Sequence, residues 1–538
     1  MPARYPARYP ARDLLALLGA ALLVYSLVAW LVPSAPYTDA AYYALVAERL
    51  GTGHGFSVPV LYSFLEVGGH LPADPMLPVP SNGHWMPLTS IVAAGPMALL
   101  GPDWRAGQIP MVVLSVALVG IAHGVAWDLW RDRRLALAAA VLMLFPGQLL
   151  AMLPQVDGSA VFGVLGALAL WATLRTTRSP RWAGWLCLAG ALIGLATLAR
   201  IDGVFLAIAP AVAWLHRRSE VTVARALGIG ALSAGACILV LAPWLARNAI
   251  VFGALLPSTG GHTLWITSYN EQFTIGREVS LATYLAWGPG PILASKLSAV
   301  VELLGRTVAI GGGVFGLFFF AGLWRMRRRP EIRPFLAYWL LMFAAMALLF
   351  TFHAPNGAFV HSAPAWLPMA FAIAVGSVAP ASTAAGRWWG FLRRPATHRF
   401  LLVASVVGAV LLSLVSSAVL LGQWRVARER LAPAAEFLST SVPDDDVVMF
   451  ADPARLNLLT GHPGVAAPFD PFDVIERVVR AYDVRWVVVT LDVGETRDAL
   501  GLWDGADAVD VDGGSPAFLP SEPDFEAPGV RVYRIKGP

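Results

Sequence analysis

The chain has 538 residues, of which 57% are hydrophobic and only 14% are charged, and its mean hydropathy is +0.62. Soluble globular domains carry about 25% charged residues, so this composition excludes a soluble protein and indicates an integral membrane protein. The formal net charge of +4 comes mostly from arginines in short clusters between apolar stretches. That pattern is typical of cytoplasmic loops and argues against nucleic-acid binding.

Long apolar stretches predict about eleven transmembrane helices, because about 18 or more apolar residues in a row can cross a bilayer. The expected spans are 14–33, 107–127, 135–154, 158–174, 182–199, 203–216, 222–245, 297–324, 334–352, 362–380 and 400–422. The first stretch follows a basic N-terminus, but it is longer than the ~7–15 apolar residues of a signal peptide. We therefore expect a retained membrane anchor there.

The segment Met86–Gly101 decides the predicted topology. It is apolar but short for a span, and Pro87 and Pro96 interrupt it. If it crossed the membrane, the later arginine clusters would face outward, whereas arginines favour cytoplasmic loops. We therefore expect it to lie along or dip into the outer interface, with the N-terminus in the cytoplasm and the C-terminus outside. The clusters that then lie inside are 4–12, 131–134, 175–181, 217–218, 325–333 and 387–399, and the outer regions are 34–106, 246–296 and everything after about residue 423.

The composition changes at Gln423, after which the chain is richer in charged residues. Alternating apolar residues predict strands, and one helix between two of them, at Val447–Phe450, Phe472–Tyr482 (the helix), Trp486–Thr490 and Val530–Ile535. The expected fold is an all-α multi-pass membrane domain, residues 1–422, with juxtamembrane helices in the first outer loop. A small α/β extracytoplasmic domain, residues 423–538, follows it.

A carboxylate opens the first long loop. Asp39 stands in Tyr37-Thr38-Asp39-Ala40-Ala41-Tyr42-Tyr43, directly after the first apolar stretch, and the loop runs on to Trp85. Loops of this length are uncommon and usually functional. Three further features follow along the membrane domain. They are His84-Trp85-Met86-Pro87-Leu88, then Asp157 at the predicted outer end of a span, then Pro243-Trp244-Leu245-Ala246-Arg247-Asn248 before Phe252-Gly253.

These motifs together resemble the membrane glycosyltransferases of the GT-C fold, in particular the branch that holds protein O-mannosyltransferases and lipid A aminoarabinose transferases. The resemblance covers the whole membrane domain. It implies a polyprenyl-phosphate-linked sugar as donor and transfer on the outer face of the membrane. One position departs from the family, which has an arginine just before the Leu-Pro that begins the next span, whereas this chain reads Gln108-Ile109-Pro110.

Sugar transfer from a lipid phosphate to a hydroxyl needs a base for the acceptor proton and donors for the leaving phosphate. Asp39, near the boundary between water and lipid, suits the base, and the alternative is a helix-capping or solvated aspartate. Arg247 suits the phosphate because its guanidinium donates two parallel hydrogen bonds; the alternative is an arginine that reaches the headgroups. Tyr42, Tyr43 and His84 belong to the same motifs, and we expect them in the substrate site.

Asp157 could position the acceptor or bind a metal ion, or it could simply cap the next helix. His262 could bind the phosphate or a divalent ion, and His353 and His361 could line the cavity. Arg200 and Asp202 are better explained as a structural pair. The sequence has no HxH, HExxH or CxxC spacing, so no cofactor is certain and a divalent metal ion stays an open alternative.

The expected function is therefore an inner-membrane glycosyltransferase that acts by direct displacement with inversion. Its partners would be a polyprenyl-phosphate sugar, membrane lipids and a protein, lipid or glycan acceptor. Two other functions remain: a lipid-linked sugar transporter or flippase, and a glycan ligase that does not use Asp39 as a base. A transporter would have short loops, internal repeats and charges in mid-membrane, whereas this chain keeps its polar residues in the predicted outer regions.

Overall fold

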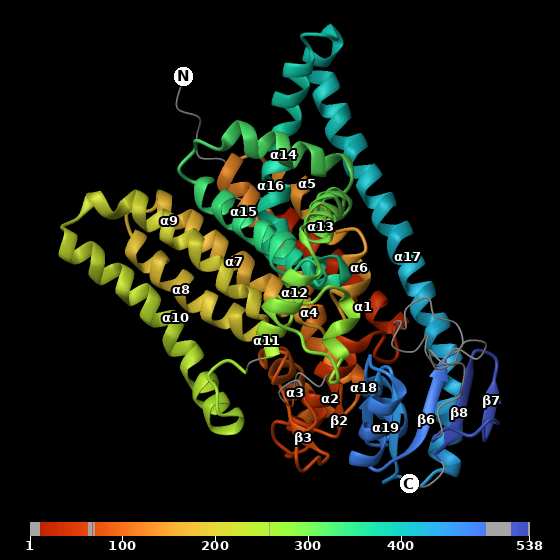
Figure 1. The fold of residues 1–538 in the computed structure, drawn as a ribbon. Coiled ribbons are helices and arrows are strands. Elements are labelled where there is room, and N and C mark those ends of the chain that lie inside the picture. Colours follow the sequence, from red (N-terminus) through yellow and green to blue (C-terminus); the bar gives the residue numbers. More distant parts are fainter. Residues whose placement is uncertain (1–10, 63–66, 68–69, 258, 491–517, 536–538) are drawn as a thin grey trace. The chain divides into compact units, whose positions relative to one another are not determined.

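The computed structural model describes residues 11–62, 67, 70–257, 259–490 and 518–535 (Figure 1). The chain divides into two compact units, each made of three separate segments. The first unit contains Met1–Leu31, Gln108–Pro243 and Ser295–Leu421; the second contains Val32–Gly107, Trp244–Ala294 and Gly422–Pro538. The basic residues Arg4 and Arg8 of the first predicted cluster lie outside the described residues. The boundary expected after residue 422 remains a prediction.

The first unit is built from helices. These are α1 (Ala11–Leu31), α4 (Trp104–Trp130), α5 (Arg133–Leu144), α6 (Leu149–Met152), α7 (Gly158–Arg178), α8 (Trp182–Ala199), α9 (Ile208–Arg217), α10 (Val223–Phe252), α13 (Pro289–Ile310), α14 (Val314–Met326), α15 (Arg333–Leu348), α16 (Phe359–Ala385) and α17 (Pro395–Ser441). One end of each of α4, α10, α13 and α17 belongs to the second unit. Short turns of other helix types lie at Ile201–Ala207 (η2), Arg218–Glu220 (η3), Ala354–Ala358 (η5) and Gly390–Arg393 (η6).

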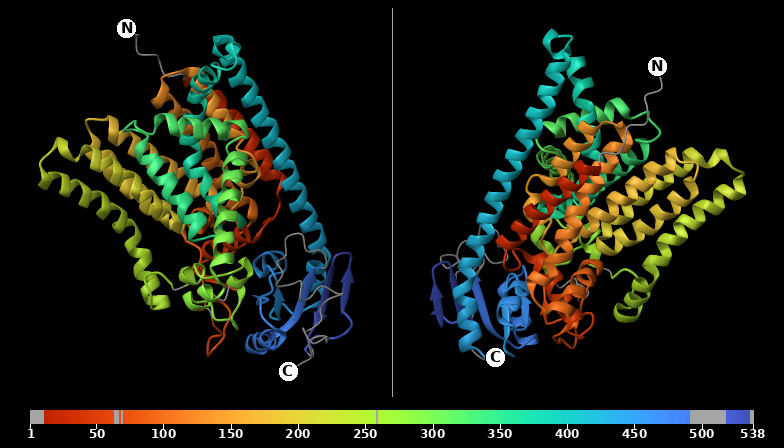
Figure 2. Two further views of the ribbon diagram at one scale, coloured as in Figure 1. Left: turned by 45° about the horizontal axis from the view of Figure 1, so that its top comes forward. Right: turned by 180° about the vertical axis from the view of Figure 1, so that it is seen from behind.

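Burial separates the central helices from the peripheral ones. Each long helix contains an apolar stretch of 18 residues. In the stretch within Ala354–Ala385, which comprises η5 and α16, 94% of the residues are buried, and in that of α7 78% are buried. The corresponding values for α1, α10 and α17 are 22% or less. Helix α16 packs against α7, α14 and α5, and α7, α8 and α9 lie side by side (Figure 2). The apolar but exposed surfaces of α1, α10 and α17 are those that a bilayer would cover.

Among the described residues, seven helices are long and apolar enough to cross a membrane, or eight if a bent pair counts as one span. The expectation of one continuous span at 297–324 is wrong, because α13 and α14 meet at an angle of 108°. The expected span 135–154 is also interrupted, since α5 ends at Leu144 and α6 begins at Leu149. The segment Met86–Gly101 forms α3 (Leu88–Leu100), whose 13 residues are about 20 Å long and too short to cross a bilayer.

Three consecutive glycines make the bend between α13 and α14. Gly312 and Gly313 have φ angles of +78° and +64°, which residues with a side chain rarely adopt. A Cβ atom on Gly312 would also lie only 3.0 Å from the Cβ of Ala409 in α17. The sequence Gly311-Gly312-Gly313 thus allows a sharp reversal where an apolar pattern alone predicts a straight helix.

The second unit contains two juxtamembrane helices and a mixed sheet. Helices α2 (Thr38–Gly51) and α3 pack against each other, as expected for the first outer loop. Within the described residues the sheet has six strands in the order β2-β5-β4-β6-β8-β7, with β2 at Val60–Leu61, β5 at Gly464–Ala466, β4 at Val447–Phe450, β6 at Val484–Thr490, β8 at Val530–Arg534 and β7 at Phe525–Ala527. Strands β2, β5, β4 and β6 are parallel, and β8 and β7 complete the sheet antiparallel.

The remaining elements of this unit are short. They are the two-stranded sheet of β1 (Ser57–Val58) and β3 (Val79–Pro80), with α11 (Thr259–His262), η4 (Tyr269–Phe273), α12 (Leu281–Ala286), α18 (Pro453–Thr460) and α19 (Phe472–Ala481). The predicted strands at 447–450, 486–490 and 530–535 and the predicted helix at 472–482 are present within one or two residues. The sequence did not reveal β2, which comes from the first loop and pairs with β5.

Candidate functional site

Helix α2 carries Asp39 as its second residue. Four alanines and one leucine, all good helix formers, stand within the buried stretch 40–47 and favour the helix, while Asp39 in the first turn is partly exposed. A carboxylate in the first turn of a helix is stabilised by the helix dipole. The sequence therefore places an accessible carboxylate on a rigid element, as a general base requires.

The aromatic residues of the same motifs gather around Tyr42. Its ring lies 4.2 Å from the ring of Trp85, and the ring of His84 meets Trp85 edge-on at 4.9 Å. The hydroxyl of Tyr42 accepts a hydrogen bond from the backbone N–H of Asn82 at 2.8 Å. Tyr43 is also buried, and its backbone carbonyl accepts a hydrogen bond from Ser90 in α3 at 3.0 Å.

Arg247 joins this cluster through the same turn. Its Nη2 donates to the carbonyl of Ser81 at 2.9 Å, one residue before the N–H that binds Tyr42. Its guanidinium also stacks on Trp244, with 4.7 Å between the guanidinium carbon and the ring centre, and on Phe252 at 4.9 Å. Such stacking fixes the plane of an arginine, so Arg247 is a preorganised cation rather than a mobile surface side chain.

The carboxyl ends of the parallel strands belong to the same unit as this cluster, and two of them, those of β2 and β5, carry polar or aromatic residues near it. Tyr62, directly after β2, lies with its ring 5.0 Å from Trp85. Beyond β5, Asp470 accepts backbone hydrogen bonds from Ile275 at 2.7 Å and Gly276 at 3.0 Å. Burial raises the pKa of Asp470, and its hydrogen bonds oppose that rise. Open parallel sheets commonly bind ligands at this edge.

Among the contacts of the described residues, none joins His262 to the cluster of Tyr42, Trp85 and Arg247. It ends the short helix α11 and is half-buried, and its backbone carbonyl accepts a hydrogen bond from Trp265 at 3.0 Å. Its expected role toward phosphate or metal remains a prediction.

Asp157 and His361 meet in the first unit. Asp157 is 1% exposed and caps α7, where its Oδ1 accepts a hydrogen bond from the N–H of Ser159 at 2.7 Å. His361, the third residue of α16, places Nδ1 3.1 Å from that oxygen and 2.9 Å from Ser159 Oγ. Asp157 thus does cap a helix, which was one of the two interpretations of this residue.

Asp157 is also available for a second role, because only one of its two carboxylate oxygens is hydrogen-bonded among the described residues. Oδ2 is buried and has no hydrogen-bond partner among the described residues. Burial alone would raise the pKa of Asp157, but the charge and hydrogen bond of His361 and the bonds from Ser159 lower it to about 2. A buried, ionised carboxylate with one unused oxygen can accept a hydroxyl proton or bind a cation, so Asp157 and His361 are candidate metal ligands.

Two polar pairs lie elsewhere in the first unit. Arg200 Nε is 3.1 Å from Asp202 Oδ1, and Ser362 in α16 donates to the other Asp202 oxygen, so the expected structural pair is present. Gln108, which stands where the family has an arginine, is buried and donates to Gln155 at 2.9 Å. Its amide therefore makes a neutral hydrogen bond inside the helices.

Comparisons with known proteins agree with this architecture. No protein-family model matches the chain. The undecaprenyl phosphate-alpha-4-amino-4-deoxy-L-arabinose arabinosyl transferase of Pseudomonas aeruginosa is 34% identical over 175 residues, which are 31% of this chain and only 29% of that enzyme. The structure of ArnT from Cupriavidus metallidurans bound to undecaprenyl phosphate matches 98% of both chains, with a TM-score of 0.61 and 14% identity.

The archaeal oligosaccharyltransferase AglB from Archaeoglobus fulgidus, in complex with an inhibitory peptide and a dolichol-phosphate, matches 91% of this chain and 71% of its own, with a TM-score of 0.58 and 15% identity. The chain has the GT-C fold of these membrane glycosyltransferases. The resemblance inferred from the sequence motifs is thereby confirmed at the level of the fold. The protein is a multi-pass membrane protein, as its composition predicts.

Sequence reasoning missed the residues that hold the GT-C motif side chains in place. Ser159 stands two residues after Asp157, a spacing typical of a capping aspartate, and this signal could have been used. The turn Ser81-Asn82, where Asn82 has a φ of +64°, binds both Tyr42 and Arg247, and nothing in the local sequence predicts that.

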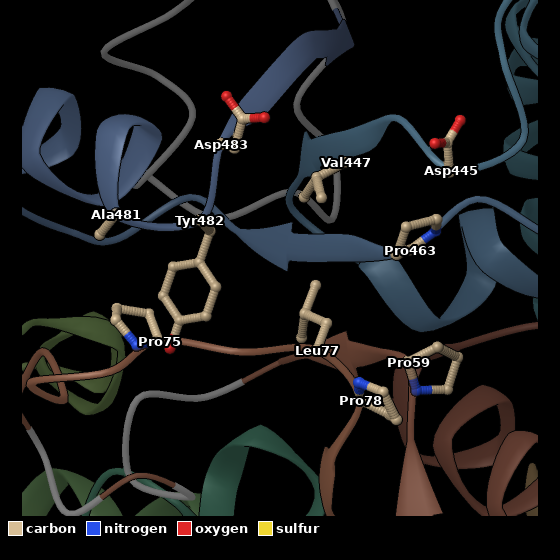
Figure 3. Close-up of a pocket in the computed structure, with 10 residues that line it drawn as sticks. All are labelled: Pro59, Pro75, Leu77, Pro78, Asp445, Val447, Pro463, Ala481, Tyr482 and Asp483. Carbon is tan, nitrogen blue, oxygen red and sulfur yellow. The ribbon is translucent and has the colours of Figure 1, made fainter.

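A separate cavity of about 420 Å³ lies at the amino ends of β2, β5, β4 and β6, the edge opposite to the aromatic cluster. Figure 3 shows its lining, formed by Pro59, Pro75, Leu77, Pro78, Asp445, Val447, Pro463, Ala481, Tyr482 and Asp483. The ring of Tyr482 extends toward Pro75 and Leu77, and burial raises the pKa of its hydroxyl to about 12. That hydroxyl therefore stays protonated at physiological pH.

Proposed function

We propose that this protein is a glycosyltransferase that moves a sugar from a polyprenyl-phosphate donor to an acceptor hydroxyl on the outer face of the plasma membrane. The observation that carries the proposal is the arrangement of one compact unit. There, the helix with the accessible carboxylate Asp39 also holds Tyr42, which shares the turn Ser81-Asn82 with the stacked cation Arg247. A base and a phosphate-binding cation are the two groups that this transfer needs.

The proposed reaction is a single displacement. Asp39 takes the proton of the acceptor hydroxyl while that oxygen forms a bond to the anomeric carbon of the sugar. The bond between the anomeric carbon and the phosphate oxygen breaks, and polyprenyl phosphate leaves with the electron pair. The anomeric configuration inverts because attack and departure take place on opposite faces of the sugar.

The leaving phosphate is assigned to Arg247. A guanidinium that is stacked and hydrogen-bonded before the donor arrives loses little freedom on binding, so its interaction with developing charge is favoured. Trp85 and Tyr42 offer aromatic surfaces for the sugar ring, with His84 and Tyr43 beside them. His262 is proposed as a further contact to the phosphate. ArnT, which has the same fold, is known in a form bound to undecaprenyl phosphate.

Asp157 and His361 are proposed to order the acceptor or to hold a divalent cation. Oδ2 of Asp157 and the imidazole of His361 offer suitable ligand atoms. One structure of the same archaeal oligosaccharyltransferase contains Zn and sulfate, with a TM-score of 0.56 to this chain. Removal of divalent ions by EDTA, followed by separate addition of Mg²⁺, Mn²⁺ and Zn²⁺, distinguishes the two roles.

The proposal is tested by the release of undecaprenyl phosphate from synthetic undecaprenyl-phosphate sugars. The purified full chain, in detergent or liposomes with a membrane extract as acceptor, is given donors that carry a pentose, a hexose, an amino hexose or 4-amino-4-deoxy-L-arabinose. Release of undecaprenyl phosphate from one donor, with the sugar recovered on an acceptor, supports the proposal. Movement of a donor across liposomes without release would favour the transporter alternative.

A further inference from the structure

The first residue of α2 makes a hydrogen bond to a distant part of the chain. Thr38, next to Asp39, donates from Oγ1 to Oδ2 of Asp452 at 2.9 Å, across 414 positions of the sequence. Asp452 follows strand β4 and is only 7% exposed. Its other oxygen accepts from the N–H of Arg455 at 3.3 Å and caps α18. One buried carboxylate therefore binds to the beginnings of two helices.

A second contact reaches the same end of α2. Tyr37 is the N-cap residue, and its side chain makes no capping hydrogen bond to the helix. Its ring lies 5.4 Å from that of Trp424 in α17 instead. Helix α18 also packs against α2. The start of α2 is thus fixed by residues from the C-terminal part of the chain, and Asp452 makes the directional contact.

We propose that Asp452 is a positioning residue for Asp39. Its bond to Thr38 fixes the first turn of α2, and with it the direction in which the neighbouring carboxylate points. The C-terminal part of the chain then helps to set the rate of transfer. This inference rests on the proposed function, in which Asp39 takes the acceptor proton.

Energetic reasoning supports a kinetic role. A negative charge at the N-terminus of α2 is favoured by the helix dipole, and a hydrogen bond to a charged group is stronger than one between neutral groups. Catalysis is sensitive to small displacements, since an error of about 1 Å in a reacting group can lower a rate about 100-fold. A contact that holds the residue next to the base should therefore affect kcat far more than donor binding.

The test compares Thr38→Val, which removes only the hydroxyl, with Thr38→Ser, which retains it. The donor is the undecaprenyl-phosphate sugar of the panel that is turned over fastest. We expect Thr38→Val to lower kcat about 10-fold or more while KM for the donor stays within about twofold, and Thr38→Ser to behave as the wild type. Thr52→Val is the matched control, because the hydroxyl of Thr52, at the other end of α2, bonds locally to the carbonyls of Glu48 and Arg49 and to Nδ1 of His54. It should leave kcat unchanged.

Asp452 is tested in parallel. Asp452→Asn keeps an oxygen that can accept from Thr38, so it should retain more activity than Asp452→Ala. The double variant Thr38→Val/Asp452→Ala should be no slower than Asp452→Ala, because both changes remove the same bond. Asp132→Ala, which removes a capping carboxylate of the same kind from α5, shows whether loss of a cap alone lowers kcat.

The outcomes separate this inference from the function on which it rests. If Asp39→Asn abolishes transfer but Thr38→Val has the kcat of the wild type, the positioning role is wrong and the proposed function stands. If Asp39→Asn transfers sugar normally, the proposed function itself is wrong. A loss of kcat in Thr38→Val with an equal loss of undecaprenyl phosphate binding would indicate general unfolding of the site, and would also overturn the inference.

Discussion

A carboxylate at the start of a helix can serve as a cap, as a functional group, or as both. Asp157 divides the two roles between its oxygens, because Oδ1 binds Ser159 and His361 while Oδ2 has no hydrogen-bond partner among the described residues. The sequence allowed both interpretations, since the preference of aspartate for the N-cap position says nothing about its second oxygen. One partner of that carboxylate, His361, comes from a helix about 200 residues further along the chain, and no local pattern could reveal it.

The low pKa of Asp157 gives a prediction about stability. Its pKa in the folded protein is about 2, below the ordinary 3.8, so the ionised form is favoured by folding. The resulting stabilisation is present above about pH 4 and disappears as the pH falls toward 2. We expect the melting temperature of Asp157→Asn in detergent to lie below that of the wild type at pH 7, with the two converging between pH 4 and 2. A difference that stays constant down to pH 2 would contradict the assignment.

Arg247 gives a prediction about donor binding. A lysine keeps the charge but lacks the planar fork and the stacking surface, so Arg247→Lys should restore little of what Arg247→Ala loses. We expect both variants to bind undecaprenyl phosphate at least about 10-fold more weakly, since a hydrogen bond to a charged group contributes about 1.5–3 kcal/mol. Arg277→Ala is the matched control, because Arg277 is exposed and also stacks on one aromatic ring, that of Phe469 at 5.0 Å. Equal binding by Arg247→Ala and the control would contradict a phosphate contact.

At the scale of elements, the sequence predicted best where the local pattern of apolar residues matches the burial of the element. Strand β4 and helix α19 were located within a residue or two, because apolar periodicity and burial agree there. Strand β2 was not, since its two residues are held by pairing with β5, which lies some 400 positions away. The bend between α13 and α14 was missed for another reason. Hydropathy identifies apolar segments but contains no information on backbone angles, and here three glycines set the geometry.

The glycine bend predicts an asymmetric response to alanine. Gly312→Ala should lower the free energy of unfolding by about 1–2 kcal/mol, because its φ is +78° and the new Cβ would press on Ala409. Gly305→Ala in the same helix pair should cause no loss, since nothing lies within 4 Å of the site and alanine is the better helix former. Denaturation in detergent by chemical or thermal means measures both. Equal effects of the two changes would mean that the bend does not need glycine.

At the scale of the molecule, the three predicted outer regions and the second compact unit almost coincide. The regions 34–106, 246–296 and 423 onward correspond to Val32–Gly107, Trp244–Ala294 and Gly422–Pro538. Arginine distribution and composition alone led to these ranges, because both reflect which parts of the chain meet water. What they could not reveal is that the first and last regions share a sheet through β2 and β5, and a hydrogen bond through Thr38 and Asp452.

The predicted orientation is tested by labelling with a thiol reagent that does not cross the membrane. The free cysteines Cys187 and Cys237 are replaced first, and single cysteines are then introduced at Asp103, Arg131 or Glu522. Asp103 and Glu522 lie in the predicted outer regions and should react from outside, whereas Arg131 belongs to a predicted cytoplasmic cluster and should react only after permeabilisation. Asp492, in the third predicted outer region, lies outside the described residues. Labelling of Arg131→Cys in intact cells would reverse the topology.

The central claim is that Asp39 takes the proton of the acceptor, and the most direct test is sugar transfer by Asp39→Asn. This change keeps the size and hydrogen-bonding capacity of the side chain but removes its charge and basicity. General-base catalysis contributes about 10²–10⁴-fold, so kcat should fall by at least about 100-fold while binding of undecaprenyl phosphate changes little. A folded Asp39→Asn protein, with the melting temperature of the wild type, that transfers sugar at a near-normal rate would contradict the account.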